Sequence, residues 1–238
     1  MKLVQKLSIG LSVACVMMMS SCSKENALTP EPKTERVNEH SSAKTDAVPW
    51  IASTKGVSGN NAFPQFWQRL NNPNYASPST HPAGTSTRTG LWGKISYAWW
   101  NPLSATPDNP APSFVTVTTS SKWDAKKMAF ASTKIRFLTP GKNYHLKFYV
   151  ASSVPKANDS GKLPSFAKQG NVWIASSGQE SQKYTVDLTS YKNCWVETTI
   201  TFKAKSSEME FIFSALAANE SQFAYAHVFV GQDAVWQQ

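Results

Sequence analysis

Every aromatic residue of this chain lies at Trp50 or beyond. The 238-residue sequence contains nine tryptophans, twelve phenylalanines and seven tyrosines, and none of them falls within residues 1–49. Large aromatic side chains contribute much of the apolar surface that a core buries, so a packed core is expected only in residues 50–238. That length suffices for one well-cored domain. Because neither a second change in composition nor an internal repeat is visible, we predict a single domain there.

Within this domain, apolar side chains recur at every second position, which is the period of a β-strand. In the clearest run, 144–150, the even-numbered residues form an apolar face and the odd-numbered residues form the opposite face. The pair Pro140-Gly141 before this run fits a type II turn. Residues 65–70 are the best candidate for a short helix. Many alternating strands without intervening helices predict an all-β domain, a β-sandwich. The predicted strands are 114–119, 128–138, 144–150, 172–175, 183–188, 195–203, 208–214 and 223–230.

Three segments interrupt the strands, namely 71–90, 101–113 and 151–170, and they are predicted to be irregular. Loops of this length in a compact domain are often functional. The second of them follows directly after the adjacent pair Trp99-Trp100. Neighbouring side chains of a strand point to opposite faces, so we expect one of these two rings to be exposed or covered by another loop.

The first 22 residues have the form of an export signal. Lys2 and Lys6 precede an apolar run, residues 7–19, and small residues lead to Cys22. The run is too short and too interrupted for a membrane-spanning helix. The string Met19-Ser20-Ser21-Cys22 resembles the lipobox of bacterial lipoproteins, although Met19 stands where that family usually has leucine. The resemblance implies that residues 1–21 are removed and that Cys22 carries acyl chains such as palmitate. Plain secretion is the alternative.

Residues 22–49 are rich in Pro, Glu, Lys and Ser and contain few large apolar side chains. Such a composition buries too little surface to offset the entropy of ordering, which predicts a lipidated, disordered tether. Its start, residues 23–26, loosely resembles the export tag of surface-displayed lipoproteins. We therefore expect the chain at the bacterial outer membrane, anchored by lipid, on the periplasmic or the cell-surface side.

The formal net charge of the chain is +9. Nucleic acid is one conceivable partner of a basic chain, but the cations are dispersed and the exported address argues against it. Attraction to an acidic polysaccharide or to anionic lipids is the better interpretation. With Cys15 in the signal and Cys22 lipidated, Cys194 has no partner for a disulfide, and we interpret it as a small buried apolar residue.

Several strand strings are similar to those of jelly-roll carbohydrate-binding modules. The strings are 138–150 (LTPGKNYHLKFYV), 184–189 (YTVDLT), 195–204 (WVETTITFKA) and 225–231 (YAHVFVG). The resemblance implies a jelly-roll sandwich of the galactose-binding-like type. Gly231-Gln232-Asp233 stands where the family's closing strand usually continues with Asp-Asn-Val, so the sequence leaves open whether a structural calcium ion is bound. A shared fold does not assign a ligand.

No sequence motif of a hydrolase, a metal site or a cofactor site is found. Glycoside hydrolysis requires two placed carboxylates. Glu208 and Glu210 share one strand face, which is more typical of a solvated surface. The four histidines lack the spacing of metal ligands. We therefore expect no enzyme, no cofactor and no metal, with a small hydrolase as the remote alternative.

Sugar binding makes a different demand, because the apolar face of a pyranose stacks on an exposed aromatic ring while its hydroxyls need polar partners. Trp67, Trp173 and Trp195 are interpreted as core residues, since each lies in or beside an alternating run. The prediction is a membrane-anchored, non-catalytic protein that binds a glycan, including an anionic one. The alternative is a structural or adhesive lipoprotein that binds a protein or an anionic polymer through its basic surface. The candidate ligand-binding residues are Trp92, Trp99, Trp100, Asn101, Trp123 and Asp124.

Overall fold

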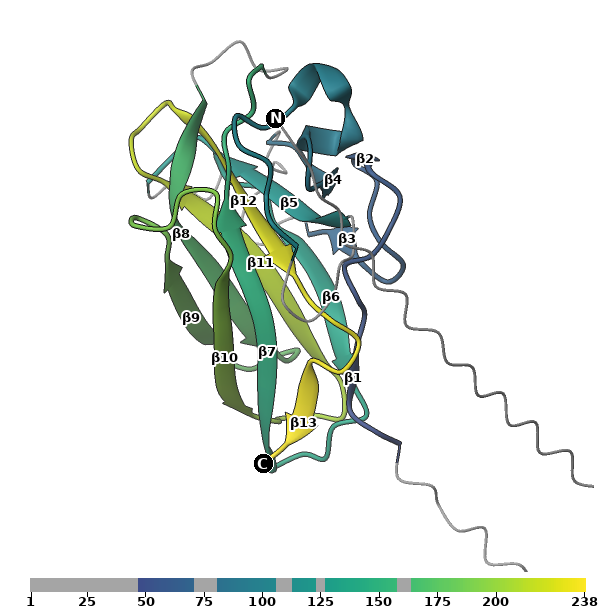
Figure 1. Cartoon of the computed structure of the whole chain (residues 1–238). Coiled ribbons are helices and arrows are strands. Elements are labelled where there is room, and N and C mark those ends of the chain that lie inside the picture. The colour runs from purple at the N-terminus through teal and green to yellow at the C-terminus, as the bar shows by residue number, and fades with distance from the viewer. Residues whose placement is uncertain (1–46, 71–80, 106–112, 123–126, 158–163) are drawn as a thin grey trace, which may run out of the picture. The chain divides into compact units, whose positions relative to one another are not determined.

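Thirteen β-strands and two short 3-10 helices make up the part of the chain that the structure describes (Figure 1). This computed structural model describes residues 47–70, 81–105, 113–122, 127–157 and 164–238. All of them lie in one unit of contacts, Thr45–Gln238. In these ranges no helix is long and apolar enough to cross a membrane.

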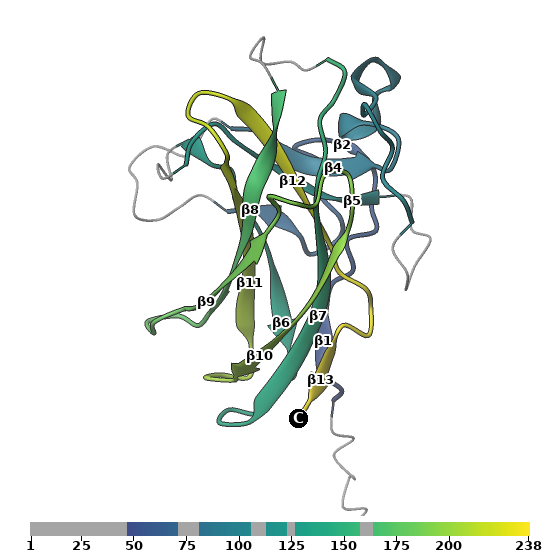
Figure 2. The same cartoon turned by 60° about the vertical axis from the view of Figure 1, so that its left-hand side comes forward.

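The strands form two sheets that share one strand. Sheet A contains β1 (Trp50–Ile51), β3 (Gln68–Arg69), β6 (Ala131–Arg136), β11 (Met209–Ala217), β8 (Pro164–Ala175) and β9 (Gln182–Asp187). Sheet B contains β10 (Val196–Lys203), β7 (Asn143–Ser152), β12 (Phe223–Phe229), β13 (Val235–Gln237), β5 (Ser113–Thr119), β4 (Ala83–Thr87) and β2 (Gly59–Asn60). In Figure 2, β8 and β11 lie on one side of the sandwich and β7 and β13 on the other.

Strand β8 joins the two sheets. Its first residues, Pro164–Phe166, pair in parallel with β12 of sheet B, and from Ala167 onward it pairs antiparallel with β11 of sheet A. The register shifts between Leu216 and Ala217, which is where this change of partner occurs. A strand that changes sheets at a bulge is a common way to close the corner of a β-sandwich.

The main core lies between the sheets and is built from the alternating apolar residues of both inner faces. Leu146, Phe148 and Val150 of β7 are fully buried there, opposite Phe211 and Phe213 of β11. The two layers approach closely at Gly170, where an added Cβ would lie 2.8 Å from Val150 Cγ1. This fold is the all-β sandwich that the strand pattern predicts, of the jelly-roll type that the resemblance implies.

Each of the eight predicted strands is present, with shifted ends. The turn before β7 is also confirmed, because Lys142 N donates to Thr139 O at 3.2 Å and Gly141 has a φ of +87°. The prediction of a helix at 65–70 is wrong, since β3 (Gln68–Arg69) occupies it. The irregular segment 71–90 contains β4, and the irregular segment 151–170 contains the start of β8.

Candidate functional site

The outer face of sheet B is divided into a covered half and an open half. The segment 88–104, which carries η1 (Leu91–Gly93) and η2 (Ile95–Tyr97), packs over β5 and β12. Its apolar side chains meet Phe114, Tyr225 and Phe229 in a second core outside the sheet. This second core occupies half of a face that a ligand would otherwise be able to reach.

Two predicted site residues belong to this second core. Trp92 is 4% exposed and Trp99 is 1% exposed. The Trp99 indole donates from Nε1 to Thr87 O at 2.9 Å, and the backbone of Trp92 is in the left-handed region, with a φ of +55°. Such a conformation is unusual for a bulky residue and is held here by burial. Rings covered in this way cannot serve as platforms for a sugar.

The other predicted site residues lie elsewhere. Trp100 is 61% exposed, with its backbone N–H bonded to Val154 O at 2.9 Å, and Asn101 beside it is exposed. The expectation that one ring of the Trp99-Trp100 pair is buried and the other exposed is therefore confirmed. Trp123 and Asp124 lie outside the described residues.

The second core surrounds one imidazole, that of His227 of β12. Its Nδ1 lies 3.0 Å from Thr116 Oγ1 and its Nε2 lies 2.7 Å from Ser153 Oγ. The imidazole also packs on the rings of Trp99 and Phe114, at centroid distances of 5.0 and 4.8 Å. Complete burial lowers the pKa of His227 to about 3, so the ring is neutral at physiological pH.

The open half of sheet B consists of the outward side chains of β7, β10 and β13, and we call it the β7–β10 face. The register places Glu197 opposite Tyr149, Thr199 opposite Lys147, and Thr201 opposite His145. On the other side of β7, Trp236 of β13 is the register partner of His145. The face is therefore a ladder of polar side chains with one aromatic ring at its side. The residues of the face are His145, Lys147, Glu197, Thr199, Thr201, Lys203 and Trp236, and the buried Tyr149 borders it where it meets the second core.

One end of the β7–β10 face borders a small cavity. The cavity has a volume of about 240 Å³ and is lined by Tyr149, Trp195 and Glu197, together with Ser104, Ala105 and Cys194. The Tyr149 hydroxyl donates to Glu197 Oε2 at 2.8 Å, and the Trp195 indole donates from Nε1 to Ser104 O at 3.0 Å. These two bonds fix a carboxylate and an indole beside the cavity.

Trp236, which is 41% exposed, lies beside the His145–Thr201 rung, one rung from the other end of the β7–β10 face. Its ring lies 5.4 Å from the ring of His145, and His145 Nδ1 lies 2.9 Å from Thr201 Oγ1. An exposed indole offers an apolar surface on which a sugar ring can stack, and hydrogen-bonding groups lie beside it here.

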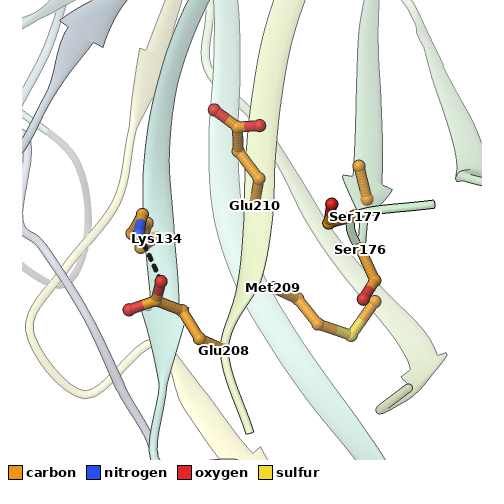
Figure 3. Close-up of a pocket in the computed structure, with 7 residues that line it drawn as sticks. Lys134, Ser176, Ser177, Glu208, Met209 and Glu210 are labelled. Atoms are coloured by element: carbon orange, nitrogen blue, oxygen red, sulfur yellow. Dashed lines mark hydrogen bonds and ion pairs between the residues drawn. The ribbon is translucent and has the colours of Figure 1, made fainter. Parts of the chain in front are cut away.

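A second cavity, of about 360 Å³, lies on the opposite sheet (Figure 3). Lys134 of β6 and Glu208 form an ion pair on one wall, and Ser176 and Ser177 stand on the other wall. Arg136 Nε also lies 3.2 Å from Glu208 Oε2. The Lys134 hydrogen bond is the main cause that holds the pKa of Glu208 below its ordinary value, so Glu208 is an ionised, paired carboxylate.

This second cavity does not present an aromatic surface, because its lining consists of charged residues, two serines, Ala175 and Met209. Glu210, which shares its strand face with Glu208, is half-buried at the cavity wall. We therefore place the candidate ligand site on the β7–β10 face and interpret the second cavity as a solvated ion-pair region.

The prediction that Cys194 is buried is wrong, because its thiol is exposed at the first cavity. Cys194 precedes β10, in a segment that follows the positive-φ residue Asn193, so strand alternation does not govern it. Among the described residues, no group of three or more His, Cys, Asp or Glu side chains could hold a metal ion.

The sequence interpretation missed Trp236 and the polar ladder beside it. The alternation in 144–150 and 195–203 already separates these polar side chains from the core face. The alternation does not predict that β7 pairs with β10 and β13, and this pairing brings the polar faces of the three strands together in one surface.

Comparisons with known proteins identify no relative at the level of sequence. No protein-family model and no curated protein matches the chain. Among solved structures, a family 61 carbohydrate-binding module in complex with β-1,4-galactotriose is 8% identical, with a TM-score of 0.37, over 66% of this chain and 88% of the module. A family 4 module is 13% identical, with a TM-score of 0.36, over 60% of this chain and 92% of the module.

A sugar-binding protein of Bacteroides thetaiotaomicron, described as putative, is 13% identical, with a TM-score of 0.35. That match covers 72% of this chain and 87% of the other. Likenesses with TM-scores below 0.5 do not assign a ligand or a family to this chain. The fold and the site stand on the strand register and on the side-chain geometry described above.

Proposed function

We propose that this chain is an exported, membrane-anchored and non-catalytic glycan-binding lipoprotein. Its ligand lies on the β7–β10 face. Trp236 supplies the stacking surface, and the polar ladder of β7 and β10 supplies hydrogen bonds to the hydroxyls. The observation that carries this proposal is the exposed Trp236 ring, braced by His145, at the side of a row of polar side chains.

The surroundings of the face support this assignment. Segment 88–104 covers another part of sheet B, whereas none of the residues that the structure describes packs over the polar ladder in the same way. Thr199, Thr201 and Lys203 are exposed on β10, where a sugar hydroxyl can reach them. The Tyr149–Glu197 hydrogen bond holds an acceptor in place at the far end. A preorganised polar surface binds with less loss of side-chain entropy.

Glycan-array binding by the full-length protein in detergent, followed by titration of the best ligand, tests the proposal. Trp236→Ala is expected to lower the affinity at least about tenfold, which corresponds to about 1.4 kcal/mol. Trp100→Ala is the matched control, because Trp100 is a second exposed indole that lies away from the face. Equal losses in both variants, or a loss in Trp100→Ala alone, would move the site away from the β7–β10 face.

The lipid anchor is proposed on Cys22. Acylation of the first mature residue with several chains holds a protein firmly on a bilayer, since each buried methylene contributes about 0.8 kcal/mol. Metabolic labelling with palmitate is expected to mark the chain and not its Cys22→Ala variant. Fractionation is expected to recover the labelled chain in the outer membrane. Release of the unlabelled wild-type chain into the medium would instead indicate plain secretion.

Absence of catalysis is part of the same proposal. Glu208 and Glu210 are two carboxylates that line one cavity, and Glu208 forms ion pairs with Lys134 and Arg136. Prolonged incubation with each bound glycan, followed by an assay for new reducing ends, checks this point. Turnover that disappears in Glu210→Gln would identify a hydrolase at the second cavity.

A structural or adhesive function is the second candidate, and the tip formed by segment 88–104 favours it. Ile95 of η2 is 96% exposed and Trp100 is 61% exposed. Figure 1 shows η1 and η2 at the end of the sandwich opposite to β1 and β13. An apolar tip beside cations suits adhesion to a protein. Cell adhesion that is lost in an Ile95→Ser, Trp100→Ser double variant, with glycan binding unchanged, would assign adhesion to this tip.

A further inference from the structure

The β7–β10 face carries its positive charges at regular positions along the strands. Position 143 of β7 is opposite Lys203, position 145 is opposite Thr201, and Lys147 is opposite Thr199. The two lysines are thus four residues apart along the ladder, about 13 Å at the rise of an antiparallel strand. Trp236 pairs with His145, so its rung lies midway between the two lysines.

The acidic side chain on this face, Glu197, lies at its upper end and keeps its negative charge. Glu197 accepts a hydrogen bond from the Tyr149 hydroxyl at 2.8 Å. Lys147 Nζ lies 6.0 Å from the centre of the Tyr149 ring, so this cation leans toward the upper end of the face. The middle and lower rungs therefore present cations and hydroxyls, with Glu197 held at the upper end.

We infer that the glycan bound on the β7–β10 face is an acidic polysaccharide whose uronic acid carboxylates contact Lys147 and Lys203 while one sugar ring stacks on Trp236. This inference rests on the glycan-binding function proposed above. A uronic acid has the same apolar ring face as a neutral sugar and adds one carboxylate. One cation on each side of the indole rung matches a polymer in which every sugar has both an apolar ring face and a carboxylate.

The separation of the cations distinguishes a polymer from a single sugar. One monosaccharide stacked on Trp236 cannot span the approximately 13 Å between the rungs of Lys147 and Lys203. A chain that follows the strands places successive carboxylates along the ladder. The net charge of +9 adds long-range attraction for such a polyanion and raises its rate of encounter.

The test compares polygalacturonate with its fully methyl-esterified form, which has the same backbone without the charge. Titration calorimetry on the full-length protein in detergent is expected to give at least about tenfold tighter binding of the acid at low salt. Salt near 0.5 M is expected to remove most of this difference, because screening shortens the range of exposed charges. Lys147→Gln and Lys203→Gln are each expected to weaken binding of the acid about threefold.

Matched variants keep the outcomes apart. Lys183→Gln on sheet A removes the same charge away from the face and is expected to leave both affinities unchanged. Trp236→Ala is expected to weaken acid and ester alike. Equal binding of acid and ester would overturn the acidic preference and leave glycan binding in place. If Lys183→Gln weakened binding of the acid as much as Lys147→Gln does, the preference would come from net charge, and the proposed contacts on the face would be overturned. Failure to bind any glycan would remove the proposed function itself.

Discussion

Burial of a neutral imidazole should make the stability of this domain depend on pH in the weakly acidic range. His227 accepts or donates its two ring hydrogen bonds within the second core, where it lies between the rings of Trp99 and Phe114. Protonation would place a charge among these rings and would make both ring nitrogens donors, so that both hydroxyls would have to accept. The expected result is a loss of stability on acidification, centred on the second core.

The magnitude follows from the two pKa values of His227. An imidazole in the unfolded chain titrates near 6.5, and burial lowers the pKa of His227 in the folded chain to about 3. Between these values the unfolded chain binds more protons, so the free energy of unfolding falls as the pH falls. Because pH 5 lies about 1.5 units below the pKa of the unfolded chain, the free energy of unfolding at pH 5 is lower by about 2 kcal/mol than at neutral pH. This loss is a large fraction of the total free energy of unfolding of a typical domain, about 5–15 kcal/mol.

Urea denaturation at pH 8, 6 and 5, followed by tryptophan fluorescence, measures the effect. His227→Gln is the matched variant, because it keeps one hydrogen-bonding group at the site and does not titrate. It is expected to be less stable than the wild type at pH 8, by about 1–3 kcal/mol. Between pH 8 and pH 5 the variant should lose about 2 kcal/mol less stability than the wild type, because it lacks the contribution of His227. An identical pH slope in both proteins would refute the assignment.

Three further variants probe the frame that holds the site. Gly84→Ala places a Cβ 2.3 Å from Gly59 O and is expected to lower stability by about 1–3 kcal/mol in urea denaturation. Tyr184→Phe removes the 2.7 Å hydrogen bond to Thr201 O; we expect a loss of about 1 kcal/mol and more light scattering, since the edge of β10 is less protected. Glu208→Gln removes two exposed ion pairs and is expected to change stability by at most about 1 kcal/mol, with an effect that disappears in high salt. A larger, salt-independent loss in that variant would contradict the view of this cavity as solvated.

The strand framework was predictable because burial on one face leaves a period of two in the sequence. Tyr144 to Val150 and Val196 to Phe202 show this period, and both runs became strands that pair along their whole length. The short strands were not predictable, since β1, β2 and β3 contain two residues each and have no period to read. β4, with the sequence AGTST, lacks the large apolar side chains that mark a strand.

The candidate site was harder to predict for a physical reason. Tryptophans beside long loops were chosen as exposed, yet Trp92 and Trp99 fold back and bury themselves on sheet B. A loop rich in aromatic residues can cover a sheet as readily as it can present rings to solvent. Trp236 has no loop or motif around it, and its neighbours on the face come from residues about 90 positions earlier in the chain. Only strand pairing brings them together.

Tyr149 links the second core to the proposed ligand face. Its ring packs in the second core, 6.1 Å from the ring of Phe229, and its hydroxyl holds Glu197 on the face. Tyr149→Phe keeps the packing and releases the carboxylate. Glu197 is negatively charged in both proteins, but without this bond its carboxylate can turn toward the middle rungs and repel an acidic glycan there. We therefore expect weaker binding of polygalacturonate and little change for its methyl ester. Stability is expected to change by about 1 kcal/mol or less, because the ring stays buried and Glu197 is exposed to water. Equal weakening for acid and ester would instead mean that Glu197 itself bonds to sugar hydroxyls.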